Sequence, residues 1–186
     1  MNILLGVTGS VAAVLADKLV SELEKLSEVK VVFTQSVYHF NDGHNVKNLY
    51  TDKDEWETFK KVGDPILHIE LRKWADVFLI APCTANTISK LANGLCDNLL
   101  TNVAAAWDYK KPIFIAPACN TFMWDHLITK RNISVLTGLG VRIISPVEKT
   151  LACGDTGIGA MADEKTIASN IFGYMAVKNA TSNTSK

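Results

Sequence analysis

Short apolar runs that alternate with helical patterns are the feature of this sequence that most constrains its fold. Residues 2–7 form an apolar run that stops at Thr8-Gly9-Ser10, and apolar residues then recur at helical spacing from Val11 to Leu26. A β-branched run follows at residues 29–34, so the first 34 residues predict a strand–helix–strand unit. Similar runs lie at 76–81, 112–116 and 141–144, and helical patterns lie at 84–92, 97–107 and 129–139.

This alternation predicts the α/β class, with an open, doubly wound parallel sheet and helices on both faces, as in Rossmann and flavodoxin-like three-layer folds. We expect a single domain over residues 1–175. The polar segment 41–64 has weak periodicity and predicts a surface excursion, whereas residues 176–186, which end in Asn, Ser and Thr, predict a disordered tail. Ligands of such sheets bind beyond the carboxyl ends of the strands, so the candidate site lies in the loops that follow them.

Charge and hydropathy exclude two classes of partner. The 19 Lys and Arg residues balance 19 Asp and Glu residues, so the chain lacks the field that attracts nucleic acid. No apolar run approaches the roughly 18 residues of a membrane span. The apolar start is similar to a signal peptide, but no Lys or Arg precedes it and Asp17 follows it. Four widely spaced cysteines without a CxxC or Cys/His pattern predict reduced thiols, no metal site and a cytoplasmic protein.

The turn Thr8-Gly9-Ser10 lies where a strand leads into a helix, so its N–H groups form a candidate anion site with Ser10 as the helix N-cap. Phosphate binding and ordinary turn chemistry explain this turn equally well. The chain has no GxGxxG or Gly-Lys-Ser/Thr motif, and its second strand ends in Thr34-Gln35-Ser36 rather than in an acidic residue that would bind a ribose. The loops therefore favour a mononucleotide such as FMN over NAD or ATP.

Two further loops, at residues 82–87 and 117–120, each place a proline directly after a strand and an asparagine a few residues later. An amide side chain can both donate to and accept from a ligand. Helix capping by Thr84 and by Asn120 explains either loop alone. Two such loops at adjacent strand ends favour a shared ligand.

His68 and Cys153 are the candidates for chemistry. His68 opens a short helical pattern that ends at Trp74, and an isolated histidine is more often a surface or capping residue than a catalytic one. Cys153 lies in a glycine-rich stretch, residues 151–161, whose backbone can fold over a ligand. A thiol releases a proton near neutrality more readily than a hydroxyl, although a small apolar turn residue is the simpler interpretation. Packing is the expected role of the other three cysteines, Cys83, Cys96 and Cys119.

Five ordered blocks resemble the homo-oligomeric flavin-containing cysteine decarboxylases, and the match covers about residues 2–173. One position departs from the family pattern Pro-x-Met-Asn, because Cys119 stands where the family has methionine; cysteine is also soft and apolar but smaller. The blocks are HIELRKWAD at 68–76, APCTANT at 81–87, GLCDNLL at 94–100, PACNTFMW at 117–124, and LACGD at 151–155 with GAMA at 159–162.

The resemblance implies bound FMN and assigns three further residues. His68 belongs to the active site, Asn120 binds the substrate carboxylate and Cys153 donates a proton. It also implies a homotrimer in which His68 of one chain meets Asn120 and Cys153 of its neighbour. The residues implied to hold FMN are Gly9, Ser10, Val11, Thr34, Ser36, Thr84, Ala85, Asn86, Thr87 and Ala118.

The activity that the resemblance implies is the decarboxylation of 4′-phosphopantothenoylcysteine in coenzyme A biosynthesis, through oxidation to a thioaldehyde, loss of CO₂ and reduction of the enethiol. Whether His68 acts as a base or positions the substrate stays open. There are two alternatives. One is a regulatory protein, like the fungal relatives that inhibit a protein phosphatase, and the other is a peptidyl-cysteine decarboxylase. The presence of His68, Asn120 and Cys153 favours an enzyme, and the block at 151–162 favours the pantothenoyl substrate.

Overall fold

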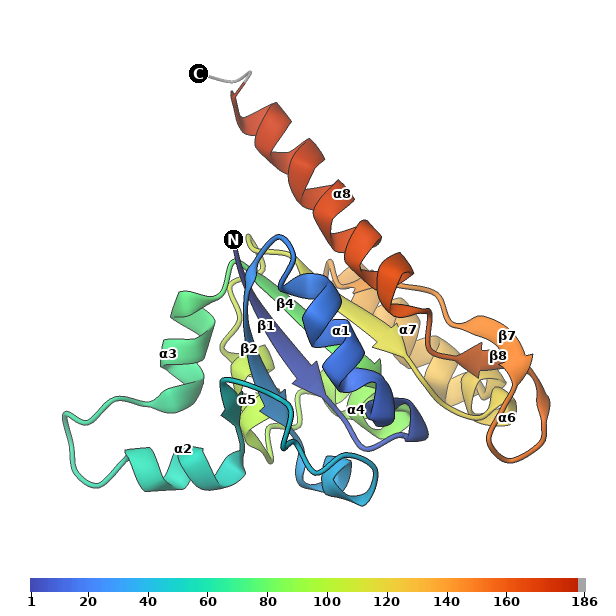
Figure 1. Ribbon diagram of the computed structural model, residues 1–186, viewed down its shortest axis with the longest axis horizontal. Coiled ribbons are helices and arrows are strands. Elements are labelled where there is room, and N and C mark those ends of the chain that lie inside the picture. The colour runs from blue at the N-terminus through green and yellow to red at the C-terminus, as the bar shows by residue number, and fades with distance from the viewer. Residues whose placement is uncertain (184–186) are drawn as a thin grey trace.

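Six parallel strands form the centre of the molecule, in the order β3-β2-β1-β4-β5-β6 (Figure 1). The structure is a computed structural model that describes the backbone of residues 1–183 and the side chains of residues 1–180. This strand order is that of doubly wound nucleotide-binding folds, so the predicted fold class is confirmed. The strands are β1 (Asn2–Val7), β2 (Glu28–Phe33), β3 (Leu49–Tyr50), β4 (Val77–Cys83), β5 (Ile113–Pro117) and β6 (Arg142–Ile143).

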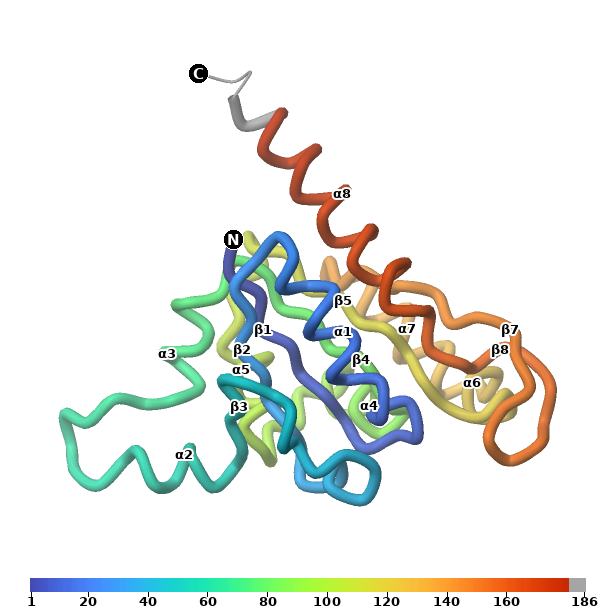
Figure 2. Tube along the Cα trace, in the orientation of Figure 1, coloured from blue at the N-terminus to red at the C-terminus, as the bar shows by residue number. Residues whose placement is uncertain are grey.

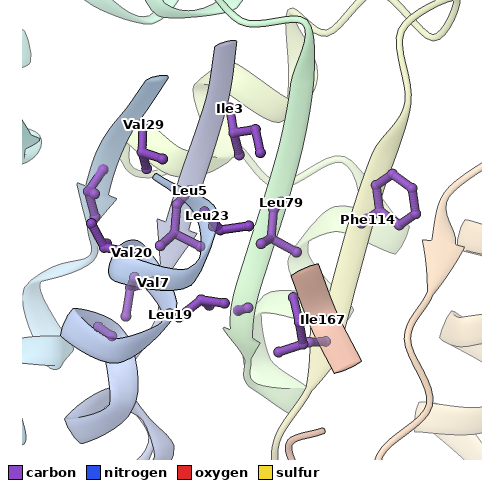
Figure 3. Packing of buried hydrophobic residues seen from close by; sticks show 14 of the residues in the cluster. Ile3, Leu5, Val7, Leu19, Val20, Leu23, Val29, Leu79, Phe114 and Ile167 are labelled. Atoms are coloured by element: carbon purple, nitrogen blue, oxygen red, sulfur yellow. The ribbon is translucent and has the colours of Figure 1, made fainter. Parts of the chain in front are cut away.

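Helices cover both faces of the sheet because successive side chains of each buried strand point to opposite sides. Leu5 and Leu79 pack under α1 (Ala16–Leu23), together with Leu19 and Leu23 of that helix and Ile167 of α8 (Glu164–Asn183) (Figure 3). The neighbouring strand residues, such as Leu4 and Phe78, pack on the other face. The helices of that face are α3 (Leu67–Trp74), α4 (Ala85–Asn93), α5 (Leu99–Ala105) and α7 (Leu127–Gly138).

The segment expected to be a surface excursion contains regular structure. Besides β3 at the sheet edge, it forms α2 (Asp52–Thr58), which begins with a capping box. In this cap, Asp54 Oδ2 accepts hydrogen bonds from the Thr51 backbone N–H and hydroxyl, both at 2.7 Å. Such a cap stabilises a helix that is too short to show a clear apolar period.

The prediction of a disordered tail from residue 176 is wrong as far as Asn183, because α8 (Glu164–Asn183) continues through it. Asp163 accepts hydrogen bonds from Thr166 at the start of this helix, and these bonds lower the pKa of Asp163. Ile171 is buried against the sheet. Once its first turns are packed, a helix extends through Ala, Met and Lys at little cost. Residues 184–186 lie outside the described residues.

Two more elements lie near the carboxyl end of β5. They are the short helix α6 (Thr121–Asp125) and an antiparallel hairpin of β7 (Val147–Thr150) and β8 (Thr156–Ala160). The tube trace shows the hairpin at the opposite end of the molecule from α2 and α3 (Figure 2). None of the helices within residues 1–183 combines the length and apolar character needed to cross a bilayer.

Candidate active site

A cavity of about 430 Å³ lies beyond the carboxyl ends of the strands, where the predicted topology directs attention. Its walls come from the 3-10 helix η1 (Val11–Leu15), from the loop after β5 and from the β7–β8 hairpin. Among the predicted residues, the cavity brings together Ser10, Val11, Ala118, Asn120 and Cys153. The loop after β1 therefore faces the hairpin although some 140 residues separate them in sequence.

The loop after β1 packs closely against the loop after β2. A Cβ atom on Gly9 would overlap the side chain of Ser36, so only glycine allows this approach. The hydroxyls of Thr34 and Ser36 lie 3.3 Å apart. Ser10 is the N-cap of η1 as predicted, since its Oγ accepts from the Ala12 N–H at 3.3 Å.

The loop after β4 is hydrogen-bonded to the loop after β1. Thr8 Oγ1 donates to the carbonyl of Pro82 at 2.8 Å and accepts from the Thr84 N–H at 3.0 Å. Thr84 caps α4 by accepting from the Thr87 N–H at 3.2 Å, which confirms the capping interpretation of this loop. Ala85, Asn86 and Thr87 form the first turn of α4, beside the end of β4 but outside the cavity wall.

Asn120, Cys153 and Asp155 form a hydrogen-bonded cluster between the loop after β5 and the tip of the hairpin. Asn120 Nδ2 donates to Asp155 Oδ2 at 2.6 Å and to Cys153 Sγ at 3.3 Å, and Cys153 Sγ donates to Asp155 Oδ2 at 3.4 Å. Cys153 and Asp155 are exposed and Asn120 is half-buried. The thiol is therefore accessible at the rim of the cavity, as a proton donor requires.

A glycine in β8 holds the hairpin in this position. A Cβ atom on Gly159 would overlap the carbonyl oxygen of Cys119, and the Cys119 N–H donates to the Gly159 carbonyl at 3.0 Å. The tip also needs Gly154, whose φ of 92° lies in the left-handed region. The glycines of this stretch thus allow a close backbone approach as well as a tight turn.

His68 lies apart from this cavity within one chain. It is in the first turn of α3, at the opposite end of the molecule from the hairpin tip that carries Cys153 (Figure 1). Glu55 of α2 accepts from the His68 backbone N–H at 3.1 Å and pairs with His68 Nδ1. These two contacts with Glu55 fix the position of the imidazole ring.

Burial distinguishes two of the cysteines from Cys153. Burial raises the pKa of the Cys83 thiol and also that of the half-buried Cys119 thiol. Both remain thiols at neutral pH. Cys83 packs in the core as the sequence predicts, whereas Cys119 lies on the cavity wall. Cys96 is exposed, contrary to its predicted packing role. All four cysteines are free.

Sequence reasoning missed Glu55, Asp155 and Lys149. Glu55 orients His68, Asp155 binds Asn120, and Lys149 is the charged residue among those that line the cavity. Asp155 could have been found, since it lies two residues after Cys153 in a block already singled out. Glu55 had no comparable signal, because it lies in a segment without clear periodicity and its partner His68 is 13 residues away.

The residues at the strand ends fit a flavin mononucleotide. Within the described residues, the backbone N–H groups of Gly9 and Ser10 donate to no protein acceptor, so they are free for a phosphate at the start of η1. Hydroxyls of Thr34 and Ser36 lie next to them, and much of the cavity wall is apolar, as a flavin ring requires. Across residues 1–183, no three His, Cys, Asp or Glu side chains gather as a metal site would need.

The sequence is similar to known flavoproteins, which agrees with a flavin site. The sequence matches the Flavoprotein family over residues 1–176. It is 50% identical over 173 residues to a phosphopantothenoylcysteine decarboxylase of Oryza sativa subsp. japonica, covering 91% of this chain and 79% of that protein. For the enzyme of Mus musculus the identity is 49%, covering 91% and 85% of the two chains.

Solved structures agree in fold. A cysteine-to-serine mutant of a PPC decarboxylase, complexed with pantothenoylaminoethenethiol, superimposes with a TM-score of 0.91 at 48% identity, covering 94% of this chain and 98% of that one. The FMN binding protein AtHal3 has a TM-score of 0.88 at 49% identity, covering 93% and 95%.

Fold and site together define a doubly wound α/β protein with a mononucleotide site at its strand ends. The chain belongs to the flavoprotein family. Within that family it is similar to the phosphopantothenoylcysteine decarboxylases along nearly its whole length.

Proposed function

We propose that this chain is an FMN-dependent carboxy-lyase that converts 4′-phosphopantothenoylcysteine to 4′-phosphopantetheine in coenzyme A biosynthesis. The observation that carries the proposal is the cluster of Asn120, Cys153 and Asp155 at the mouth of a mononucleotide-sized cavity. The identity of about one half to phosphopantothenoylcysteine decarboxylases supports the substrate.

Decarboxylation of a cysteinyl group needs help, because loss of CO₂ from an ordinary carboxylate leaves a carbanion that nothing delocalises. Bound FMN supplies the electron sink that makes the thioaldehyde accessible. The chain's own residues supply the rest. The free N–H groups of Gly9 and Ser10 bind the flavin phosphate, together with the hydroxyls of Thr34 and Ser36, and Ala118 lines the ring pocket.

Two residues act on the substrate. The Asn120 amide donates to its carboxylate and orients the bond that breaks. Cys153 then donates a proton to the enethiol as it is reduced, since a thiol is a much stronger acid than water or a hydroxyl. The ethenethiol bound to the cysteine-to-serine mutant of the related decarboxylase is the species expected when this last protonation is blocked, which supports the assignment.

The active site is completed by a neighbouring chain in a cytoplasmic homotrimer, with the flavin at each subunit boundary. Within one chain His68 is remote from Cys153, so a second chain must bring the histidine (Figure 1). Large exposed apolar side chains in the elements that carry His68 and Asn120, or in segments next to them in sequence, support an assembly that buries them. They are Trp56 (74% exposed) in α2 and Val62 (95%) in the loop between α2 and α3, and Phe122 (78%) in α6 and Leu127 (83%) in α7.

A comparison of kcat/KM for two substrates tests the proposed substrate against the peptidyl-cysteine alternative. We expect the purified protein to release CO₂ from 4′-phosphopantothenoylcysteine with a kcat/KM about a hundredfold above that for a peptide ending in cysteine. 4′-Phosphopantothenoylserine is the matched control and should release no CO₂, because it lacks the thiol that is oxidised. Equal rates on the peptide would contradict the proposed substrate, and no release from either would favour a regulatory protein.

A further inference from the structure

The side-chain amide of Asn120 has no donor left for a ligand. Its Oδ1 accepts from the Phe122 N–H at 2.8 Å as the N-cap of α6, and this bond fixes which way the amide faces. Nδ2 therefore points to the hairpin, where its two hydrogens reach Asp155 Oδ2 at 2.6 Å and Cys153 Sγ at 3.3 Å. An amide nitrogen carries only two hydrogens, so a substrate must displace one of these partners.

We propose that Asp155 is a placeholder for the substrate carboxylate on Asn120, and that it thereby sets the selectivity of the site between carboxylate-bearing and carboxylate-free molecules. The inference rests on the proposed function, in which Asn120 binds the carboxylate of 4′-phosphopantothenoylcysteine. Asp155 presents the same chemical group to the same donor, and a hydrogen bond from an amide to a charged carboxylate is among the stronger ones.

The hairpin tip links this exchange to the thiol. Cys153 Sγ donates to the same Asp155 oxygen at 3.4 Å. The Leu151 N–H donates to the Asp155 carbonyl at 2.7 Å, and the Gly154 N–H donates to the Leu151 carbonyl at 2.9 Å, so residues 151–155 are tied into one turn. When the substrate carboxylate takes the Asn120 donor, Asp155 moves aside together with the turn that carries the thiol.

The exchange affects only molecules that carry a carboxylate. Two carboxylates at one amide repel each other, so substrate binding and Asp155 binding exclude each other. The decarboxylated product has no carboxylate and cannot compete with Asp155 for Asn120. Asp155 therefore returns to the amide after CO₂ is lost, and its presence there weakens the binding of carboxylate-bearing molecules but not that of carboxylate-free ones.

The test compares two unreactive molecules that differ only in the carboxylate. These are 4′-phosphopantothenoylserine and the ethanolamide of 4′-phosphopantothenate, titrated by calorimetry into the FMN-loaded protein. In Asp155→Asn the placeholder is neutral and easier to displace, so we expect the serine compound to bind about tenfold tighter than in the wild type. The ethanolamide should bind within about twofold of the wild type, because it makes no demand on Asn120.

Two further variants make the result specific. Asp155→Ala removes the placeholder and should also bind the serine compound more tightly. Glu148→Gln removes one negative charge from the exposed β7 strand of the same hairpin and should change neither affinity. A purely structural role for Asp155 predicts weaker binding of both compounds.

The proposal is overturned if neither Asp155 variant gains affinity for the serine compound, or if both compounds gain equally. Turnover of 4′-phosphopantothenoylcysteine by the wild type is measured in parallel. A wild type that does not decarboxylate this substrate contradicts the proposed function itself, whereas an active wild type without the expected gain contradicts only the role of Asp155.

Discussion

Replacing Cys153 with serine is expected to lower the formation of 4′-phosphopantetheine by about a thousandfold or more, while the oxidised enethiol accumulates. A hydroxyl is a far weaker acid than a thiol, so the last protonation stops although oxidation and CO₂ loss continue. The side chain hardly changes in size and lies on the exposed tip of the hairpin, so the fold is retained. Mass spectrometry of the products, with CO₂ release followed in parallel, measures the effect.

Cys96→Ser is the matched control, because Cys96 is also an exposed free thiol but lies outside the walls of the cavity. It should form phosphopantetheine at the wild-type rate. If Cys153→Ser also does so, Cys153 is not the proton donor and is only a small residue in a glycine-rich turn.

Complementation between inactive variants is the second large effect that we expect. His68→Asn and Cys153→Ser should each be nearly inactive alone, yet regain activity when the two chains are co-expressed. In randomly mixed, equimolar trimers each boundary draws its histidine side and its cysteine side independently. About one half times one half, or roughly a quarter, of the boundaries are then intact, and specific activity should reach about a quarter of the wild type.

The control for this experiment uses two residues of the same half-site. Asn120 and Cys153 contact each other within one chain, so mixed trimers of Asn120→Asp and Cys153→Ser contain no intact boundary and should stay inactive. Mixed trimers are purified through a different tag on each variant, which removes the homotrimers and raises the expected activity of the first pair from about a quarter to about one third of the wild type. Activity near zero for the first pair, or a monomer in analytical ultracentrifugation, would contradict the shared site.

The sheet was predictable because its central strands are buried on both faces and read as nearly continuous apolar runs. The expected strands at 2–7, 29–34, 76–81, 112–116 and 141–144 correspond to β1, β2, β4, β5 and β6. β3 was not predictable, since two edge residues are too short to show a pattern.

The hairpin that carries Cys153 was not predicted from the sequence, because its second strand contains two glycines. Glycine is rare in strands, so Gly157 and Gly159 argued against β8. Both are needed because Thr121 and the Cys119 carbonyl occupy the space of a side chain, a contact that sequence does not reveal. The tail prediction also failed because of a contact that sequence does not reveal. Ile171 packs on the sheet, and the helix that it anchors continues through a polar sequence.

Site residues were predictable where topology alone brings them together. Parallel strands end at one edge, so Ser10, Ala118 and Asn120 meet there. Asp155 and Glu55 depend on individual long-range contacts with Asn120 and His68, and these have no local pattern.

The most direct test of the whole account is an anaerobic product balance with the purified protein and no added NAD, ATP or metal. The protein should be yellow, and CO₂ and 4′-phosphopantetheine should form in equal amounts over many turnovers per flavin, with the flavin oxidised again when the substrate is exhausted. A colourless protein, turnover that needs added NAD, or a flavin left reduced after a single turnover would contradict it.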